Sequence, residues 1–313
     1  IIMNESTQYT YYTADVFTDQ PFHGVALPVF PDACGLTDSQ MQQIANELSA
    51  ASTIFLQPTA EEYNRTIRVF SKEKEIPASI HTILAASYVL AKTSVPLTSK
   101  HTLITLSSLM KGHEQVISSF VSKGNDGEIG IVQQTYDTHA AIDYYTPTHE
   151  ELAAMLSLSP ADIGFDNYRP LIVSCGVPYL IVPIMSYTAI REAKFNEAAW
   201  SNSSAPSSLA QEILLFANNT DDNPADFHAR LLGPAIAHHE DPPIGGAIAA
   251  FANHICDHSH VQAGTHIFAI QRGANDARKS LFYIEMDNQQ SKDLTIRVGG
   301  HAVLMSETSI RVS

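Results

Sequence analysis

The segment 81–92, HTILAASYVLAK, is apolar on nearly every side, and this constrains the fold more than any other stretch of the chain. A helix without a polar face has to be buried among other elements. The segment 245–255, GGAIAAFANHI, has the same character. An acidic residue and proline precede each helix, at Glu75 and Pro77 for the first and at Asp241 and Pro242 for the second. Each half of the chain therefore needs a shell of secondary structure around one helix.

Short segments rich in β-branched and aromatic residues can supply that shell, because such segments favour strands. Two surface helices are indicated by capping boxes, in which Thr37 is followed by Gln40 and Thr148 by Glu151. The segment 201–208, SNSSAPSS, is predicted to be a flexible surface loop. The predicted strands cover 9–16, 53–57, 66–70, 101–106, 115–121 and 129–133, and then 171–173, 179–183, 213–216, 266–270, 281–285, 294–298 and 302–306.

Many short strands around one buried helix in each half predict an α+β fold with two similar domains. Each domain is expected to be a curved, mostly antiparallel sheet or barrel around its central helix. A length of 313 residues suits two domains, which we place at 1–135 and 136–313, with the option that the last strand returns to the first half. Two such domains back to back would bring the first turns of both helices to one cleft.

The charge balance excludes some classes of partner. Lys and Arg number 18 and Asp and Glu number 33, which gives a formal net charge of −15. Nucleic acids and anionic membrane surfaces attract basic proteins, so neither is an expected partner. No run of 18 apolar residues indicates a membrane span. The first residues are not typical of a signal peptide and the three cysteines are widely spaced, so a cytoplasmic protein with reduced thiols is expected.

Six motifs together resemble the PhzF-like family, the phenazine-biosynthesis isomerase and its relatives. In chain order they are ADVFTDQPFHG, LTDSQMQQIANEL, IPxxxH, VSCGVPYLIVP, EDPxxGxA and VGGHAVL. The resemblance runs from about Tyr9 to Ile310. It implies two domains of the diaminopimelate epimerase fold with an active site between them. It also implies cofactor-free proton transfer on a small molecule and assembly as a homodimer.

The chain departs from the family pattern at the positions that carry its chemistry. Ser52 in AST stands where the family usually has the glutamate of SET. His81 in ASIHTI matches the histidine of FAGHPT, but Ile80 replaces the glycine before it. In DPPIGGA, Asp241 and Gly245 match the pattern DPATGSA, whereas Ile244 and Gly246 replace a threonine and a serine.

Proton transfer between carbon atoms needs a base whose conjugate acid titrates near neutral pH. A serine hydroxyl alone cannot fill that role, which leaves His81 and Asp241 as candidates. Histidine titrates near neutrality, and the positive end of a helix disfavours the imidazolium, which would keep His81 neutral and basic. Asp241 could orient His81 or bind a substrate amine. The structural alternatives are a buried, hydrogen-bonded His81 and an Asp241 that caps its helix.

Two glycines at the start of the second apolar helix are compatible with an anion site. Gly245 and Gly246 would let backbone N–H groups approach a substrate carboxylate closely. Close packing of the helix against the sheet explains them equally well. Ile80 and Ile244 add apolar bulk where a polar ligand would be expected. The site is therefore predicted either to take a more apolar ligand or to be partly filled.

No cofactor and no metal are predicted. His254, Cys256 and His258 have a spacing that resembles a metal site, but no matching ligand pair occurs elsewhere. Cys175 has no partner thiol in a corresponding motif, so it does not indicate a cysteine-based epimerase.

Two functions follow from these residues. The first is an isomerase or epimerase that acts on a small carboxylate-bearing metabolite, with His81 and Asp241 as the reactive pair and Ser52 in place of the family glutamate. The second is an inactive binding or structural protein with the same fold.

Overall fold

The computed structural model describes residues 6–59, 64–110, 112–220, 222–236, 239–274, 277–291 and 293–313. Both halves of the chain contain many strands and few helices, so the predicted α+β class is confirmed. The chain divides into two compact units. Unit 1 contains residues up to Thr135 together with Val298 onward, and unit 2 contains Tyr136–Arg297. None of the helices in the described part of the chain is long and apolar enough to cross a membrane.

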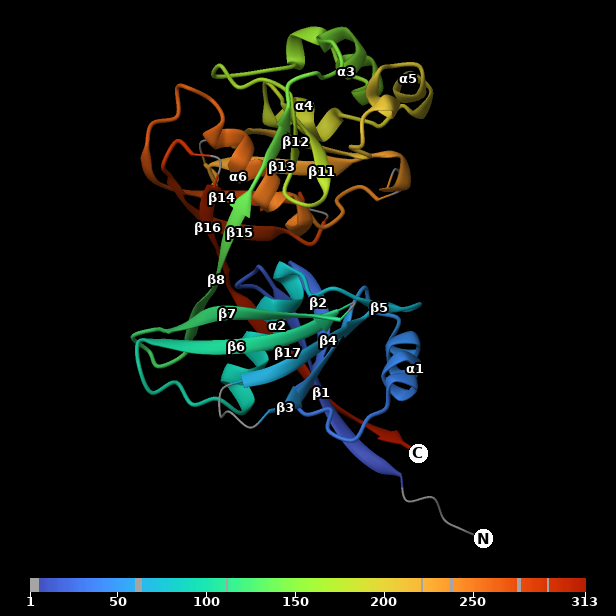
Figure 1. Cartoon of the computed structure of the whole chain (residues 1–313), viewed down its shortest axis with the longest axis vertical. Helices are drawn as coiled ribbons and strands as arrows, with labels where there is room; N and C mark the ends of the chain where they lie inside the picture. The colour runs from blue at the N-terminus through green and yellow to red at the C-terminus, as the bar shows by residue number, and fades with distance from the viewer. Residues whose placement is uncertain are drawn as a thin grey trace. The chain divides into compact units, whose positions relative to one another are not determined.

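Unit 1 consists of one curved sheet, a helix on its outer side and a helix inside it (Figure 1). Its elements are β1 (Thr7–Val16), β2 (Val25–Phe30), α1 (Asp38–Leu48), β3 (Thr53–Pro58), β4 (Asn64–Phe70), β5 (Glu75–Ile76), α2 (Ile80–Thr93), β6 (His101–Met110), β7 (His113–Lys123), β8 (Ile129–His139) and β17 (Ala302–Val312). The chain leaves this unit within β8 and returns within β16 (Asp293–Gly300).

Unit 2 contains the remaining elements. They are β9 (Ala141–Asp143), α3 (His149–Leu156), β10 (Leu171–Ser174), β11 (Pro178–Pro183), α4 (Tyr187–Glu192), α5 (Glu197–Ser201), β12 (Glu212–Asn218), β13 (Phe227–Leu232), α6 (Ile248–Cys256), β14 (Gly264–Arg272) and β15 (Ser280–Asn288). Short 3-10 turns lie at Pro160–Asp162 (η1), Ala205–Ser207 (η2), Pro234–Ile236 (η3) and Gly245–Ala247 (η4).

The two units repeat one pattern of strand pairing. In unit 1 the successive pairs β1–β2, β2–β3, β3–β4, β4–β6 and β6–β7 are antiparallel, parallel, antiparallel, parallel and antiparallel. In unit 2 the pairs β10–β11, β11–β12, β12–β13, β13–β14 and β14–β15 follow the same order. Parallel neighbours need a crossover connection, usually a helix. The second crossover of each unit contains the apolar helix, α2 in unit 1 and α6 in unit 2.

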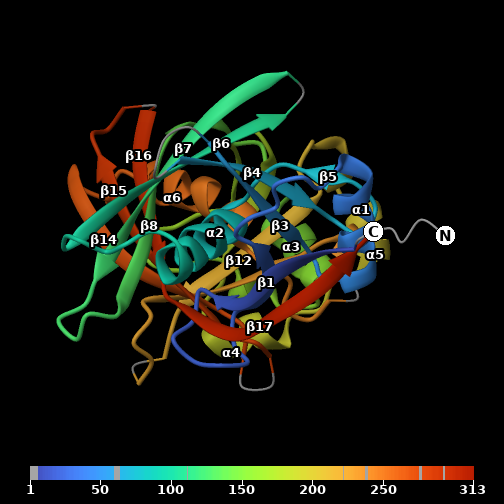
Figure 2. The same ribbon diagram turned by 90° about the horizontal axis from the view of Figure 1, so that it is seen from below.

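Helix α2 lies inside its sheet, as its sequence requires. Every residue from His81 to Leu90 is buried, and the helix contacts β1, β2, β3, β7 and β17. Figure 2 shows α2 with β1 and β17 on one side and β7 on the other. The buried hydroxyl of Ser87 is paired with that of Ser119 at 2.6 Å, so this polar group is not left unsatisfied. Helix α6 packs in a similar way against β10 and β11.

Several boundaries differ from the sequence predictions. Strands β2 and β13 were not predicted, although both contain mostly buried residues. The segment 201–208 is not an irregular loop, because Ser201 ends α5 and residues 205–207 form η2. The second apolar helix begins as the 3-10 turn η4 and becomes an α-helix only at Ile248. The last strand, β17, pairs with β1 along its whole length in unit 1.

Candidate functional site

His81 lies in the first turn of α2 and is 8% exposed. The helix begins with a capping box: the Thr82 backbone N–H donates to the Ser79 hydroxyl at 3.4 Å, and the Ser79 N–H donates to the Thr82 hydroxyl at 2.8 Å. The buried amide of Gln134 donates to the Ile80 carbonyl at 2.8 Å. These bonds fix the backbone on both sides of His81, so its ring has a defined position.

Phe17 forms one wall around the His81 ring. The two ring centroids are 5.0 Å apart and the planes meet at 74°, an edge-to-face contact. Phe17 is fully buried and has a φ of +58°, a left-handed conformation that costs energy for a bulky residue. A Cβ atom on Gly300 would lie 2.4 Å from the Phe17 ring and 3.2 Å from Leu84. We call His81, Phe17, Leu84 and Gly300 the His81 enclosure.

A tight loop after Phe17 supports this enclosure. The buried carboxylate of Asp15 accepts a hydrogen bond from the Phe22 N–H at 2.7 Å. The Thr18 N–H donates to the His301 carbonyl at 3.2 Å, which joins the loop to the residue after Gly300. Gly24 has a φ of +62°, and a Cβ there would lie 2.0 Å from the Val16 carbonyl oxygen. The motifs FTDQPFHG and VGGHAVL therefore meet beside His81, which no spacing in the sequence indicated.

Ser52 immediately precedes β3 and is half-buried. The residue after it, Thr53, is fully buried and pairs with Phe70 in β4. Strand β3 contacts α2 within unit 1. Ser52, Ile80 and His81 thus belong to one unit and to neighbouring elements.

Asp241 belongs to unit 2, where Arg191 holds it in an ion pair. The Arg191 guanidinium donates to both carboxylate oxygens, at 2.7 Å each, and the Asp241 side chain is only 3% exposed. Arg272 donates to the Asp241 backbone carbonyl at 2.9 Å, and Arg230 donates to that of Glu240 at 3.0 Å. Three arginines therefore fix the residues that lead to η4. The sequence suggested that Asp241 orients His81, binds a substrate amine or caps its helix, and the structure shows an ion pair with Arg191.

His228 lies beside Arg191 in this cluster and is a weak base. An Arg191 N–H points to Nε2 of His228 at 3.3 Å, so this nitrogen accepts and the neutral ring carries its proton on Nδ1. Burial, reinforced by the positive charge of Arg191, lowers the pKa of His228 to about 4. Burial also lowers the pKa of Arg272, to about 10.

Gly246 at η4 packs closely against Tyr179 of β11. A Cβ on Gly246 would lie 2.8 Å from the Tyr179 hydroxyl, so a side chain here would have to displace that hydroxyl. Gly245 is buried, and the Ile244 side chain, 1% exposed, is part of the core. The turn begins without a side-chain cap. The carboxylate site predicted at Gly245 and Gly246 remains a prediction, as does the shared cleft for the two helix starts.

The histidines at the end of α6 make structural hydrogen bonds. Nε2 of His254 lies 2.7 Å from the Arg169 carbonyl, and Nδ1 of His258 lies 2.8 Å from the His254 carbonyl. Nε2 of His258 accepts from the Arg169 N–H at 3.1 Å. Burial lowers the pKa of His254 to about 3 and also lowers that of His258. Across the described residues, no group of three or more His, Cys, Asp or Glu side chains could hold a metal ion.

Comparison with known proteins places these features in a family. Residues 14–308 match the family model PhzC-PhzF, described as phenazine biosynthesis-like protein. The chain is 27% identical over 310 residues to an uncharacterized isomerase of Mesorhizobium japonicum, covering 95% of this chain and 97% of that protein. It is 24% identical over 301 residues to trans-2,3-dihydro-3-hydroxyanthranilate isomerase of Pseudomonas chlororaphis, covering 96% and 98%. The crystal structure of a PhzF-family phenazine biosynthesis protein of Bacillus anthracis superposes with a TM-score of 0.78 at 20% identity, covering 97% of this chain and 99% of that one, and shows the same fold.

Proposed function

Because the chain belongs to the phenazine biosynthesis-like (PhzC-PhzF) protein family, we propose that it is an isomerase. It moves a proton between carbon atoms of a small carboxylate-bearing metabolite without a cofactor. His81 removes the proton as a neutral imidazole and returns it as the imidazolium, so no net proton is gained or lost. The proposed activity is the isomerase activity that the names of the relatives state, but the proton is carried by His81 and not by a glutamate.

The observation that supports this function is the construction of the His81 enclosure. A bulky residue in a left-handed conformation, Phe17, packs on the histidine, and a glycine is required behind it. Backbone strain of this kind persists only where the surrounding structure holds it in place, and it is concentrated at functional sites. An imidazole positioned by such a structure is suited to acid–base work, which requires a fixed geometry.

Ser52 and Asp241 have smaller roles in this proposal. A serine hydroxyl without a base beside it does not exchange protons near neutral pH, so Ser52 contributes at most a hydrogen bond to the substrate. The Asp241 carboxylate is neutralised by Arg191 within unit 2. We assign it to holding the segment before η4 in place, and His81 remains as the proton-carrying group.

The second candidate is a binding protein that has lost turnover. Three observations favour it: the family glutamate is replaced by Ser52, Asp241 is held in a buried ion pair, and Ile244 fills a core position. General acid–base groups contribute about 10²–10⁴ in rate, so the loss of one without replacement would leave little activity. The same fold would then bind the metabolite without converting it.

Hydrogen exchange in deuterated water separates the two candidates. The purified 313-residue chain is incubated with small amino and hydroxy acids and with trans-2,3-dihydro-3-hydroxyanthranilate, the compound named for its relative. Deuterium incorporation at carbon is followed by mass spectrometry. An isomerase incorporates deuterium into at least one compound. A binding protein incorporates none, and the variant Ser52→Glu, with Ile80→Gly to open space, gains exchange.

A further inference from the structure

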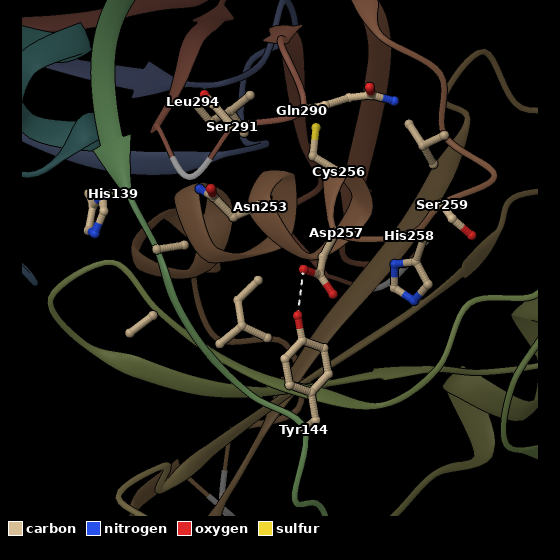
Figure 3. A pocket seen from close by; sticks show the side chains of 14 residues that line it. His139, Tyr144, Asn253, Cys256, Asp257, His258, Ser259, Gln290, Ser291 and Leu294 are labelled. Atoms are coloured by element: carbon tan, nitrogen blue, oxygen red, sulfur yellow. Dashed lines mark hydrogen bonds between the residues drawn. The ribbon is translucent and has the colours of Figure 1, made fainter.

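A second site lies in unit 2, beyond the C-terminal end of α6. It is a pocket of about 720 Å³ between the end of this helix, the segment 139–144 and the residues around 290 (Figure 3). Pockets that bind small molecules usually measure about 300–1,000 Å³. The lining residues are His139, Ala140, Ala141, Ile142, Tyr144, Asn253, Cys256, Asp257, His258, Ser259, Val261, Gln290, Ser291 and Leu294.

This pocket is separate from the proposed proton-transfer site. Neither Ser52, Ile80 and His81 nor Asp241, Gly245 and Gly246 line it. Gly245 and Gly246 precede α6, whereas the pocket lies against the last residues of that helix. A ligand here is therefore not explained by the proposed function.

The charges around the pocket favour a cation. None of the described residues that line it is a lysine or an arginine, and Asp257 is its carboxylate. Asp257 is also the C-cap of α6, and the carbonyl end of a helix carries a partial negative charge. The helix end and the carboxylate therefore both favour a positively charged ligand.

The Asp257 carboxylate is oriented by its neighbours. The Tyr144 hydroxyl donates to Oδ1 at 2.9 Å, the bond drawn in Figure 3. Because the hydroxyl proton is used in this bond, the Tyr144 oxygen is left to accept a hydrogen bond from a ligand. Arg169 does not line the pocket, but it forms an ion pair with this carboxylate, with Nη2 3.8 Å from Oδ2. Its guanidinium carbon lies 5.5 Å from the centre of the Tyr144 ring, and its side chain is 59% exposed. A water-exposed partner at this distance screens the carboxylate only in part.

The other reactive side chains do not oppose a cation and do not suggest chemistry. Both ring nitrogens of His258 are used in hydrogen bonds that keep the ring neutral. His139 is paired with Asp293 on the surface. Burial raises the pKa of the Cys256 thiol to about 12, so it stays protonated beside Met286. The pocket is therefore built to bind a ligand and not to react with it.

Apolar side chains also line the pocket. Ala140, Ala141, Ile142, Val261 and Leu294 line it. They can cover a short aliphatic body, while the Asp257 carboxylate and the Tyr144 oxygen receive the donors of a charged head.

We propose that this pocket binds a small organic cation, a primary alkylammonium group on a short aliphatic body. The ammonium donates to the Asp257 carboxylate and the Tyr144 oxygen, and the aliphatic part packs on Ile142 and Leu294. An ammonium has three donors and no acceptor, which matches a site that offers acceptors at one end.

Titration with n-butylammonium tests this site, with 1-butanol and butyrate as ligands of matched size and different charge. Binding to the ¹⁵N-labelled full-length protein is followed through amide shifts of unit 2. Two variants probe the pocket: Asp257→Asn removes the charge and keeps the acceptor for Tyr144, and Ala141→Leu fills the space and keeps the carboxylate. The control Asp166→Asn removes an exposed charge in the same unit and keeps the contact with Asn218.

The expected result is saturable binding of n-butylammonium, with shifts centred on residues 253–259. Affinity falls about tenfold or more in Asp257→Asn, the loss typical of a hydrogen bond to a charged group, falls in Ala141→Leu and is unchanged in Asp166→Asn. The proposal is overturned if 1-butanol or butyrate binds as well as the amine, if Asp257→Asn binds like the unaltered protein, or if no ligand saturates the pocket. Amide spectra of the variants without ligand confirm that each is folded.

Discussion

At the scale of single residues, Gly300 is the clearest case of a position set by close packing. The two adjacent glycines in VGGHAVL had no explanation in the sequence alone. The structure supplies one, because the Phe17 ring occupies the place of a side chain at residue 300. Neither the left-handed Phe17 nor its contact with His81 could be predicted, since phenylalanine does not usually adopt that conformation.

The variant Gly300→Ala should therefore destabilise the protein. The added methyl group would overlap the Phe17 ring, and overpacking of a core costs about 1–3 kcal/mol. Urea denaturation followed by circular dichroism measures the change. In the control Gly124→Ala the nearest atom belongs to the exposed Asp126 carboxylate, which can turn away. Equal stability of the two variants would show that residue 300 tolerates a side chain.

At the scale of secondary-structure elements, the apolar helices could be predicted, but the contacts that hold the neighbouring segments in place could not. A helix without a polar face identified α2 and α6, and capping boxes identified α1 and α3. Strands β2 and β13 were missed because their apolar runs are short and lack alternation. The partner of Asp241 could not be predicted, because Arg191 lies 50 residues earlier on a six-residue helix that no sequence pattern indicated.

The ion pair between Arg191 and Asp241 should contribute much more to stability than a surface pair. Removal of one partner leaves a buried charge, at a cost of about 3–5 kcal/mol. We expect a loss near the lower end for Arg191→Ala, since this side chain is 16% exposed. The comparison variant is Lys92→Ala, which breaks the surface pair with Glu128 and should cost less than about 1 kcal/mol. Urea midpoints that fall equally in both variants would contradict a structural role for the Asp241 pair.

At the scale of the whole molecule, the repeat of strand pairing was only partly visible in the sequence. The two halves share the same order of parallel and antiparallel strand pairs, but their amino-acid sequences match poorly. Packing constrains the polarity and size of a residue more than its identity. The similarity of the two halves is therefore seen in the position of their crossover helices and not in shared sequence motifs. The homodimer implied by the family stays a prediction.

Stability should depend on pH through the buried histidines of unit 2. The folded-state pKa is about 4 for His228 and about 3 for His254, below the value of about 6.5 in an unfolded chain. Below pH 6.5 the unfolded chain thus binds protons that the folded chain does not. Stability is complete above that pH and falls as the pH drops towards 4, by about 1.4 kcal/mol per pH unit for each histidine.

Two measurements check this expectation. Urea midpoints are recorded between pH 7 and pH 5, above the range in which most carboxylates titrate. NMR titration follows the ring protons of His228 and His254. We expect both buried rings to stay neutral at pH 5. Titration of both rings near pH 6.5, or stability that rises on acidification, would contradict the assignment.

The rate of deuterium incorporation into a substrate shows whether His81 carries the proton in this protein. The measurement compares the unaltered chain with His81→Asn and with His101→Asn, which removes an exposed histidine of the same unit. We expect exchange in the unaltered chain, a loss of about 10²-fold or more in His81→Asn, and no change in His101→Asn. Exchange that persists at the full rate in a folded His81→Asn protein would contradict it.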